Sequence, residues 1–300
     1  MTFPTAAGFG NFPTGKYAPE IWSRELIMNL RENLVSSAIT NTDYEQELFA
    51  YGDTLTILKE NEITIEDYSA GASANDQFLN DDSVQLLIDQ GKSFNFVTED
   101  VQTKLANIDW ASKQMTRAVF DLTSAIDVNI LEHMRDNAST NALLGASGSP
   151  ITVNNDAGNI SPIDFLGDAC TILDENNVYA DNRFAAAKPA FFKQLRRESS
   201  GLSDASVTGS SSSFLNKNLM FGGQEINGFK LYQSTNIPVS ANSDDIILFG
   251  HKEATATAVA ITKTKIEDVN GKWMQRYMGM AAFGRKVIRP EMLFVGFVTH

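Results

Sequence analysis

The chain has 300 residues, of which 43% are hydrophobic and 20% are charged, proportions that exclude wholesale disorder. Its formal net charge of −13 disfavours broad affinity for nucleic acid. The acidity suits either a protein that stays dispersed until a specific partner arrives or one from a salty habitat. Cys170 is the only cysteine, which excludes an intrachain disulfide. The sequence has no run of about 18 apolar residues and no secretory signal, so we expect a soluble protein used without export.

The first 18 residues combine aromatic side chains with prolines and glycines, and Lys16 is their only charge. Proline and glycine oppose regular structure, whereas a solvated tail rarely holds so many rings. A disordered tail and an extended arm docked on another surface, such as another subunit, both fit this pattern, and we favour the arm. Its candidate contact residues are Phe3, Phe9 and Phe12. Beyond it, apolar residues at every fourth position from Trp22 to Leu34 predict a short amphipathic helix.

Apolar and polar residues alternate within residues 48–97, which is the pattern of half-buried strands. All charges from Glu60 to Asp82 are acidic. Long segments without a tight turn signal predict a two-stranded arm that reaches outward and needs a surface to lie on. That surface belongs either to the same chain or to a neighbour. The candidate contact residues of this region are Leu55, Ile57, Ile63, Ile65 and Phe78.

A long helix is predicted to follow the last of these strands without an intervening turn. Thr98 is placed to cap its first amides, and apolar residues recur at helical spacing from Val101 to Met134. Such a helix spans on the order of 55 Å, which exceeds the usual length in globular proteins. An arm attached without slack to a stiff helix is suited to transmitting geometry over distance.

The remaining sequence mixes helical and strand patterns, so the predicted fold class is α+β. Ser161 and Pro162 predict the start of one helix, and Pro189 predicts the start of another directly after a buried strand. The run GLSDASVTGSSSS is of low complexity and is interpreted as a surface loop.

Two interpretations concern the last quarter of the chain. An Ala/Thr-rich stretch from His251 to Ile261 is interpreted as a helix. Residues 272–298 are interpreted as strands broken at Gly279, Gly284 and Pro290.

No catalytic or metal-binding motif emerges from the sequence. Stretches such as GASGS fail the nucleophile-elbow pattern, and no phosphate-cradling loop is present. His133, His251 and His300 each lack a second ligand at metal-binding spacing. Acidic clusters are interpreted as solvated turns rather than cation sites. We therefore expect a protein that is not an enzyme and uses no cofactor.

Two groups of basic residues stand out against the acidic chain. One contains Lys193, Arg196 and Arg197, and the other contains Arg285, Lys286 and Arg289. Each could meet phosphate, but the net charge favours pairing with acidic segments such as residues 60–82.

The order of these segments resembles the major capsid proteins of tailed bacteriophages, which have the Hong Kong 97-type fold. APEIWSRELIMNLRENLV is similar to the N-terminal helix of that family, and YGDTLTI and LLIDQGKSFNFVTEDVQ are similar to the two strands of its extended loop. Residues 98–136 resemble its spine helix. RFAAAKPAFFKQL, INGFKLYQSTNIP, LFGHKEA and FGRKVIRPEMLFVGF resemble its later segments. No single motif is specific, and the resemblance lies in the order of segments over nearly the full chain.

The resemblance implies a division of the chain into seven parts. These are an N-terminal arm at 1–18, an N-terminal helix region at 19–47, an extended loop at 48–97, a spine helix of the peripheral domain at 98–137, an axial domain at 138–248, peripheral strands and a helix at 249–289, and a C-terminal strand at 290–300 that returns to the axial domain.

The resemblance implies a hinge at the strand-to-helix join, with Phe96, Val97 and Thr98 as candidate residues. It also implies a function and partners. Copies of the chain would assemble as pentamers and hexamers into an icosahedral shell, which encloses packaged double-stranded DNA without sequence-specific binding. A separate scaffolding protein is expected because the chain is too short to carry a large scaffolding segment of its own. A portal protein is a further expected partner and a decoration protein an optional one. The expected location is the virion capsid, after assembly in the host cytoplasm.

Three other interpretations stay open at this point. The shell protein of a bacterial encapsulin-type nanocompartment would share the fold and would bind cargo proteins. A monomeric or small oligomeric enzyme requires a clustered site that the sequence does not show. A nucleic-acid-binding protein would use the two basic groups, which the net charge opposes.

Overall fold

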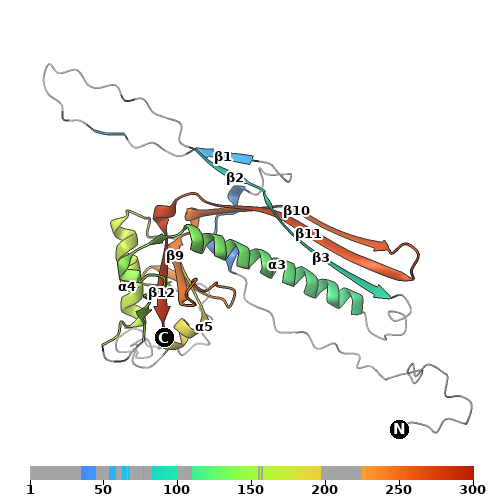
Figure 1. The fold of residues 1–300 in the computed structure, drawn as a ribbon. Coiled ribbons are helices and arrows are strands. Elements are labelled where there is room, and N and C mark those ends of the chain that lie inside the picture. The colour runs from blue at the N-terminus through green and yellow to red at the C-terminus, as the bar shows by residue number, and fades with distance from the viewer. Residues whose placement is uncertain are drawn as a thin grey trace, which may run out of the picture.

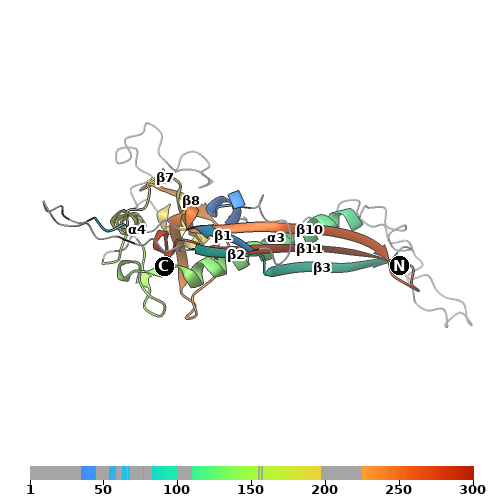
Figure 2. The same ribbon diagram turned by 90° about the horizontal axis from the view of Figure 1, so that it is seen from above.

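Two sheets, one long helix and a two-stranded arm make up the described part of the chain (Figure 1). The computed structural model describes residues 35–44, 54–58, 63–65, 67, 77, 83–99, 110–154, 156, 158–196 and 225–300. A compact unit lies at one end. A long, narrow extension built from the second sheet and the long helix projects from it (Figures 1 and 2).

The compact unit, here called the seven-stranded unit, has a sheet of order β4-β12-β9-β6-β8-β7, with β5 also paired to β12. The C-terminal strand β12 lies inside this sheet, antiparallel to β9 and parallel to β4. Two helices, α4 (Pro162–Glu175) and α5 (Pro189–Leu195), pack against it. Its strands are β4 (Ser139–Thr140), β5 (Ile151–Thr152), β6 (Arg183–Ala187), β7 (Glu225–Ile226), β8 (Phe229–Gln233), β9 (Asp245–His251) and β12 (Leu293–Thr299).

Aromatic rings withdrawn from water form the core of the seven-stranded unit. Phe249 of β9 contacts Phe165 of α4 and Phe229 of β8, with ring centroids 5.8 and 5.6 Å apart. All three rings are fully buried. A Cβ at Gly296 of β12 would lie 2.9 Å from the Phe165 ring, so only glycine lets the strand pass this close. Burial of rings of this size is a main source of stability for the unit.

The extension is a three-stranded antiparallel sheet of order β10-β11-β3. It is formed by β10 (Thr255–Asp268), β11 (Met274–Val287) and β3 (Gln90–Glu99). At about 3.3 Å per residue, the 14-residue strands β10 and β11 each span roughly 45 Å. Phe96 of β3 stacks on Tyr277 of β11 with ring centroids 5.1 Å apart, and Phe94 covers Gly279.

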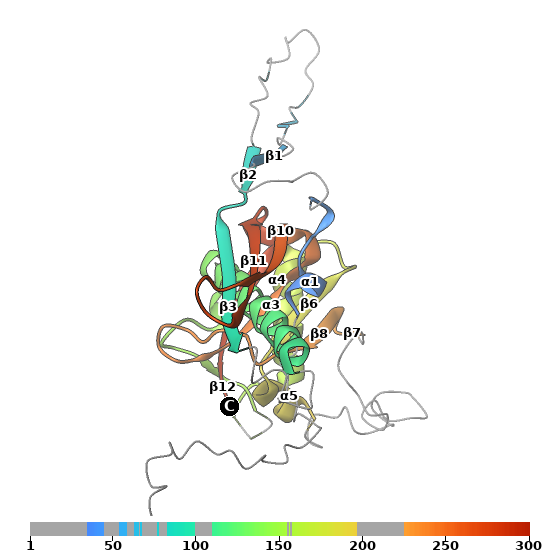
Figure 3. The same ribbon diagram turned by 90° about the vertical axis from the view of Figure 1, so that its right-hand side faces the viewer.

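The helix α3 (Trp110–Asn137) runs along one face of this sheet (Figures 1 and 3). Its 28 residues give a length of about 42 Å. Ile126, Ile130 and Met134 in its C-terminal half are buried in the same core as the seven-stranded unit. The helix therefore joins the extension rigidly to the compact unit.

A buried carboxylate on α3 holds the described N-terminal segment in place. Asp127 Oδ1 accepts hydrogen bonds from the backbone N–H groups of Val35 at 3.1 Å and Ser36 at 2.7 Å. Its Oδ2 accepts one from the side-chain amide of Asn236 at 3.0 Å. Because three donors satisfy this buried group, the short helix α1 (Ser36–Ile39) begins at a fixed point on α3.

Several local predictions are confirmed. The hydroxyl of Ser161 accepts a hydrogen bond from the N–H of Asp164 at 3.1 Å, and Pro162 is the first residue of α4. Pro189 begins α5 directly after the fully buried strand β6. The alternating residues before and after the acidic segment form β1 (Thr54–Leu58) and β2 (Ser83–Leu87), which pair antiparallel.

The predicted long helix is present as α3, but its predicted start and one other predicted helix are wrong. Thr98 does not cap a helix: it lies within β3 opposite Gln275, and the first described residue of α3 is Trp110. The stretch from His251 to Ile261 holds the end of β9, a 3-10 turn (Lys252–Ala254) and the start of β10. Its alternating threonine and apolar residues are paired with β11, and sheet pairing outweighs the helical propensity of alanine.

Of the three predicted strand breaks, only the one at Pro290 is present. β11 continues through Gly279 and Gly284 without interruption, whereas Pro290 does begin a 3-10 turn (Pro290–Met292) before β12. Of the amphipathic helix predicted up to about Val35, only its last residue falls within the described ranges.

Candidate assembly surfaces

The arm, formed by β1 and β2, lies on the face of the three-stranded sheet opposite to α3 (Figures 1 and 3). Leu55 pairs with Leu86 and Ile57 pairs with Val84. One side of β1 is half-buried, while the other is exposed and ends in Leu58, whose side chain is 73% exposed. The arm therefore presents one apolar side to its own chain and a second surface outward.

The base of the arm rests on small residues. Leu86 and Ile88 are fully buried against Ala256, Ala258 and Ala282 of the three-stranded sheet. A Cβ at Gly284 of β11 would lie 2.5 Å from the carbonyl oxygen of Leu87. The backbone of the arm thus passes directly over β11, and the absence of larger side chains sets how closely it crosses.

The predicted contact residues of this region differ in exposure. Leu55 and Ile57 pack partly against the chain's own cluster around Leu86. Ile63 and Ile65 are 66% and 93% exposed, and neither lies in a strand, contrary to the predicted alternation. Phe78 of this region lies outside the described residues, as do the predicted contact residues of the N-terminal arm, Phe3, Phe9 and Phe12.

The predicted hinge residues lie inside a strand rather than at a strand-to-helix join. Phe96, Val97 and Thr98 each pair with a residue of β11, so a change of angle here would break sheet hydrogen bonds. The arm leaves the sheet earlier, at the two-residue link Ile88 and Asp89 between β2 and β3.

Sequence reasoning missed an apolar tip on the extension. Trp273 is 84% exposed in the turn between β10 and β11, and Ile266 of β10 is 58% exposed. This turn lies at the end of the extension farthest from the seven-stranded unit (Figures 1 and 2). The turn pair Asn270-Gly271 directly before the tryptophan was an available signal, because a core tryptophan is not expected at a turn.

A second apolar surface lies on the face of the extension that α3 does not cover. The alternation of side chains that turns Phe96 and Phe283 toward the helix side turns Val97 and Met280 away from it. Both are 44% exposed. Ion pairs flank them, with Lys265 2.5 Å from Glu267.

The described members of the two predicted basic groups lie in different surroundings. The side chain of Arg196 donates a hydrogen bond to Gln233 at 3.4 Å, and Arg197 lies outside the described residues. Arg289 precedes the 3-10 turn at Pro290, and its backbone N–H binds the carbonyl of Ala254. Only Arg285 and Lys286 line a common feature.

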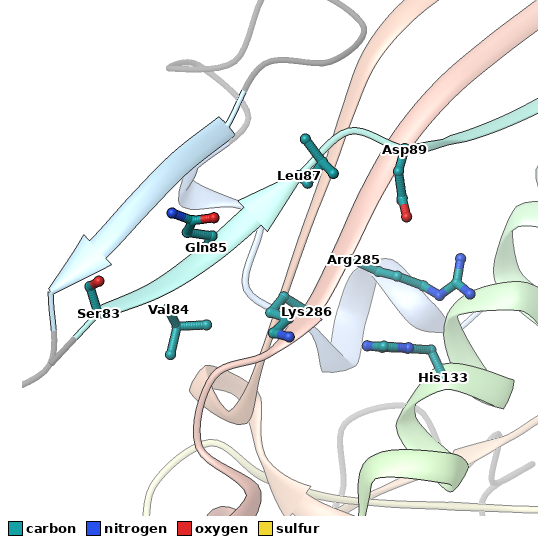
Figure 4. A pocket seen from close by; sticks show the side chains of 8 residues that line it. All are labelled: Ser83, Val84, Gln85, Leu87, Asp89, His133, Arg285 and Lys286. Atoms are coloured by element: carbon teal, nitrogen blue, oxygen red, sulfur yellow. The ribbon is translucent and has the colours of Figure 1, made fainter.

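That feature is a hollow of about 580 Å³ at the base of the arm, between β2, β11 and α3 (Figure 4). Burial lowers the pKa of His133 below its ordinary value of 6.5, and the charges of Arg285 and Lys286 lower it further, while Asp136 and Asp89 oppose them. The imidazole is therefore neutral at neutral pH. The hollow is lined by Ser83, Val84, Gln85, Leu87, Asp89, His133, Arg285 and Lys286.

The described ranges contain neither a metal-binding cluster nor a membrane-spanning helix. No group of three or more His, Cys, Asp or Glu side chains there is placed to hold a metal ion. No helix among the same residues is long and apolar enough to cross a membrane. What these surfaces offer is apolar area and charge for contact with another molecule.

Comparison with solved structures identifies the fold. A chain of Mycobacterium phage Che8 matches with a TM-score of 0.76 and 22% identity, covering 94% of this chain and 98% of that one. The capsid of cyanophage P-SCSP1u matches with a TM-score of 0.68 and 14% identity, covering 94% and 93%. The capsid of Ralstonia phage GP4 matches with a TM-score of 0.60 and 13% identity, covering 99% of both chains. The fold is that of phage capsid proteins.

Sequence comparison finds no such relative, since no family model and no curated protein matches. The capsid fold is thus shared at identities too low for sequence matching, while the order of elements persists along nearly the whole chain. The α+β capsid fold predicted from the order of segments is confirmed.

Proposed function

We propose that this chain is a major capsid protein of a tailed bacteriophage, a structural protein whose copies build an icosahedral shell around packaged double-stranded DNA. The observation that carries the proposal is the end-to-end match to phage capsids, in which the two chains cover each other almost completely. The copies would associate as pentamers and hexamers.

The exposed apolar surfaces support assembly. The outer side of the arm and the open face at Val97 and Met280 both lie on the side of the extension opposite α3, and the tip at Trp273 lies at its far end. Each surface is small, and individually weak contacts become stable only when a closed shell adds them together. Weak single contacts also let misplaced subunits dissociate before closure.

In this proposal each expected division of the capsid fold has a role in the shell. Residues 138–248 with strand 290–300 form the axial part near the centre of each pentamer or hexamer. Residues 98–137 and 249–289 form the peripheral part. Residues 1–18 and 48–97 reach over neighbouring subunits, with Phe3, Phe9, Phe12, Ile63, Ile65 and Phe78 as contact residues.

The proposed partners follow from the proposed shell. They are a separate scaffolding protein, a portal protein and, as an option, a decoration protein. DNA is enclosed without sequence-specific binding, because a chain of net charge −13 repels phosphate rather than neutralising it. Assembly takes place in the host cytoplasm, and the mature location is the virion. Empty shells with a steep, salt-sensitive affinity for DNA would contradict this electrostatic role.

The alternative is the shell of an encapsulin-type nanocompartment, which would use the same contacts to enclose cargo proteins. The matched structures are phage capsids and the capsid of a GTA particle, and they do not favour this alternative. Neither proposal assigns the chain an enzymatic activity.

The test is expression of the chain alone and together with a candidate scaffolding protein, followed by sedimentation velocity and negative-stain imaging. We expect large closed particles, or rings of five and six subunits that close when scaffold is present. A chain that remains monomeric under every condition, with the arm protected from proteolysis in that monomer, would overturn the proposal.

A further inference from the structure

The hollow at the base of the arm is lined in part by polar groups that have no hydrogen-bond or ion-pair partner among the described residues. Lys286 is exposed at its rim and has neither an ion pair nor a side-chain hydrogen bond to any described residue. Figure 4 shows its side chain between β2 on one side and His133 of α3 on the other. A single unpaired cation on a surface is ordinary, but this one faces a partly enclosed space.

The tautomer of His133 places a second donor in the same region. Its Nδ1 lies 3.2 Å from the side-chain nitrogen of Asn137, and an amide nitrogen can only donate. Nδ1 therefore accepts, and the ring proton of the neutral imidazole is on Nε2. That Nε2 is buried and has no hydrogen-bond partner among the described residues. A buried donor without an acceptor costs free energy, which an incoming acceptor would recover.

Charges around the ring favour an anion. Arg285 and Lys286 each lower the pKa of His133 more than Asp136 or Asp89 raises it, so the potential at the imidazole is positive. The guanidinium of Arg285 is itself bound to Asn129 of α3 and keeps its charge close to the ring. Asp89, on the link between the arm and β3, points toward Arg285, and its charge raises the pKa of that guanidinium against the effect of burial.

We propose that this hollow is an oxyanion site, in which a carboxylate or phosphate group binds between the ammonium of Lys286 and the Nε2–H of His133. The bound group would connect β11 with α3 directly beneath β2. Because β2 crosses β11 at this position, occupancy stiffens the point at which the arm leaves the body. The group is either a free anion or, resting on the proposed shell function, a carboxylate of a neighbouring copy.

The first test uses inorganic phosphate and unassembled chain, so it does not depend on shell formation. The ring signals of His133 are followed by NMR as phosphate replaces chloride at constant ionic strength. We expect saturable binding, a rise in the pKa of His133 and tighter binding as the pH falls, because an anion favours the imidazolium. Lys286→Gln should weaken binding by about tenfold or more, the effect of losing one charge-assisted hydrogen bond.

A matched control separates the site from general charge. Lys272→Gln removes an equal charge from an exposed residue in the turn at the far end of the extension, and it should leave phosphate binding unchanged. His133→Gln keeps a side-chain donor without a titratable ring. It should abolish the pH dependence while keeping part of the affinity.

The second test distinguishes the source of the anion in assembled shells. If a neighbour's carboxylate fills the hollow, shells of Lys286→Glu should dissociate more readily than shells of Lys286→Gln, with Lys272→Glu shells equal to the parent. If free phosphate fills the hollow, the unassembled chain binds phosphate. In phosphate-free buffer, shells of Lys286→Glu and Lys286→Gln then dissociate equally readily. An unassembled chain that ignores phosphate, combined with shells in which both Lys286 variants equal the parent, would overturn the site. Failure of shells to form at all would instead count against the proposed function.

Discussion

The seven-stranded unit and the extension with its arm differ in how far they bury their apolar side chains. All five residues of the central strand β6 are buried, and Phe165, Phe229 and Phe249 fill the space beside it. In the extension and arm, β1 and β3 are covered on one side only, where most of the covered side chains are half-buried. The four most exposed large apolar side chains of the described residues, Ile65, Trp273, Leu58 and Ile63, all belong to the second region. One region is complete by itself, and the other has apolar surface left for a partner.

Truncating a ring in the complete region should have the largest effect on the isolated chain. Phe249→Ala removes a fully buried ring that contacts two others, and such truncations cost about 3–5 kcal/mol. Urea unfolding of unassembled chain followed by fluorescence or circular dichroism measures the loss. If the variant unfolds at the parent's urea concentration, the core of the seven-stranded unit is not the main source of stability.

A substitution at the crossing of the arm should have an intermediate effect. Gly284→Ala places a Cβ 2.5 Å from the backbone oxygen of Leu87, which must move, and overpacking of this kind costs about 1–3 kcal/mol. Hydrogen exchange should rise selectively at residues 83–88. Gly91→Ala is the matched control, since its Cβ would meet only the oxygen of Ala281 at 4.0 Å. Equal exchange in both variants would mean that the arm does not rest on Gly284.

Lowering the pH should weaken the isolated chain slightly through both regions. Burial lowers the pKa of His300 in the seven-stranded unit and of His133 beside the arm below 6.5. The unfolded chain then binds more protons, so the contribution of each histidine is full above its unfolded pKa and is lost as the pH falls below it toward the folded pKa. The free energy of unfolding, measured between about pH 7.5 and about pH 5.5, should depend less on pH in His300→Gln or His133→Gln than in the parent, and least in the double variant. An unchanged pH profile in the double variant would assign the dependence to carboxylates.

The smallest effect on the isolated chain should come from the tip of the extension. Trp273→Ala removes a side chain that is 84% exposed, and surface substitutions change stability by about 0.5 kcal/mol or less. Assembly yield measured by sedimentation should nevertheless fall, because the exposed ring is area that a partner would cover. If Trp273→Ala greatly lowered the stability of the isolated chain, or if the variant assembled normally, the contrast between the two regions would not hold at Trp273.

Local patterns predicted what local interactions decide. The cap at Ser161, the start at Pro189 and the alternation in β1 and β2 are written in neighbouring residues, and the structure has them where they were predicted. The stretch after His251 and the cap at Thr98 were wrong because β11 pairs with both segments, and that pairing is invisible in either segment alone. Gly279 and Gly284 were read as breaks, yet they leave room for Phe94 and for the backbone of Leu87.

The candidate surfaces were harder to predict than the fold. The hollow joins residues 83–89, 133 and 285–286, which meet only after the sheet and the helix have formed. The buried bonds of Asp127 to Val35 and Ser36 cross more than ninety residues of sequence. Trp273 could have been recognised, because its place beside a turn pair was visible from the start.

The strand order of the extension leaves two edges, and these carry a hazard. Within the described part of the chain, β3 and the far part of β10 are the outer strands of the sheet, and an outer strand is the template onto which a foreign strand adds. Near the compact unit, β10 is covered by the pairing of Asn41 with Ala256. Farther out, Lys263, Lys265 and Glu267 put charge along the bare edge. Charged residues on an edge strand oppose pairing with the strand of another molecule, and they therefore oppose the growth of fibres from this long sheet.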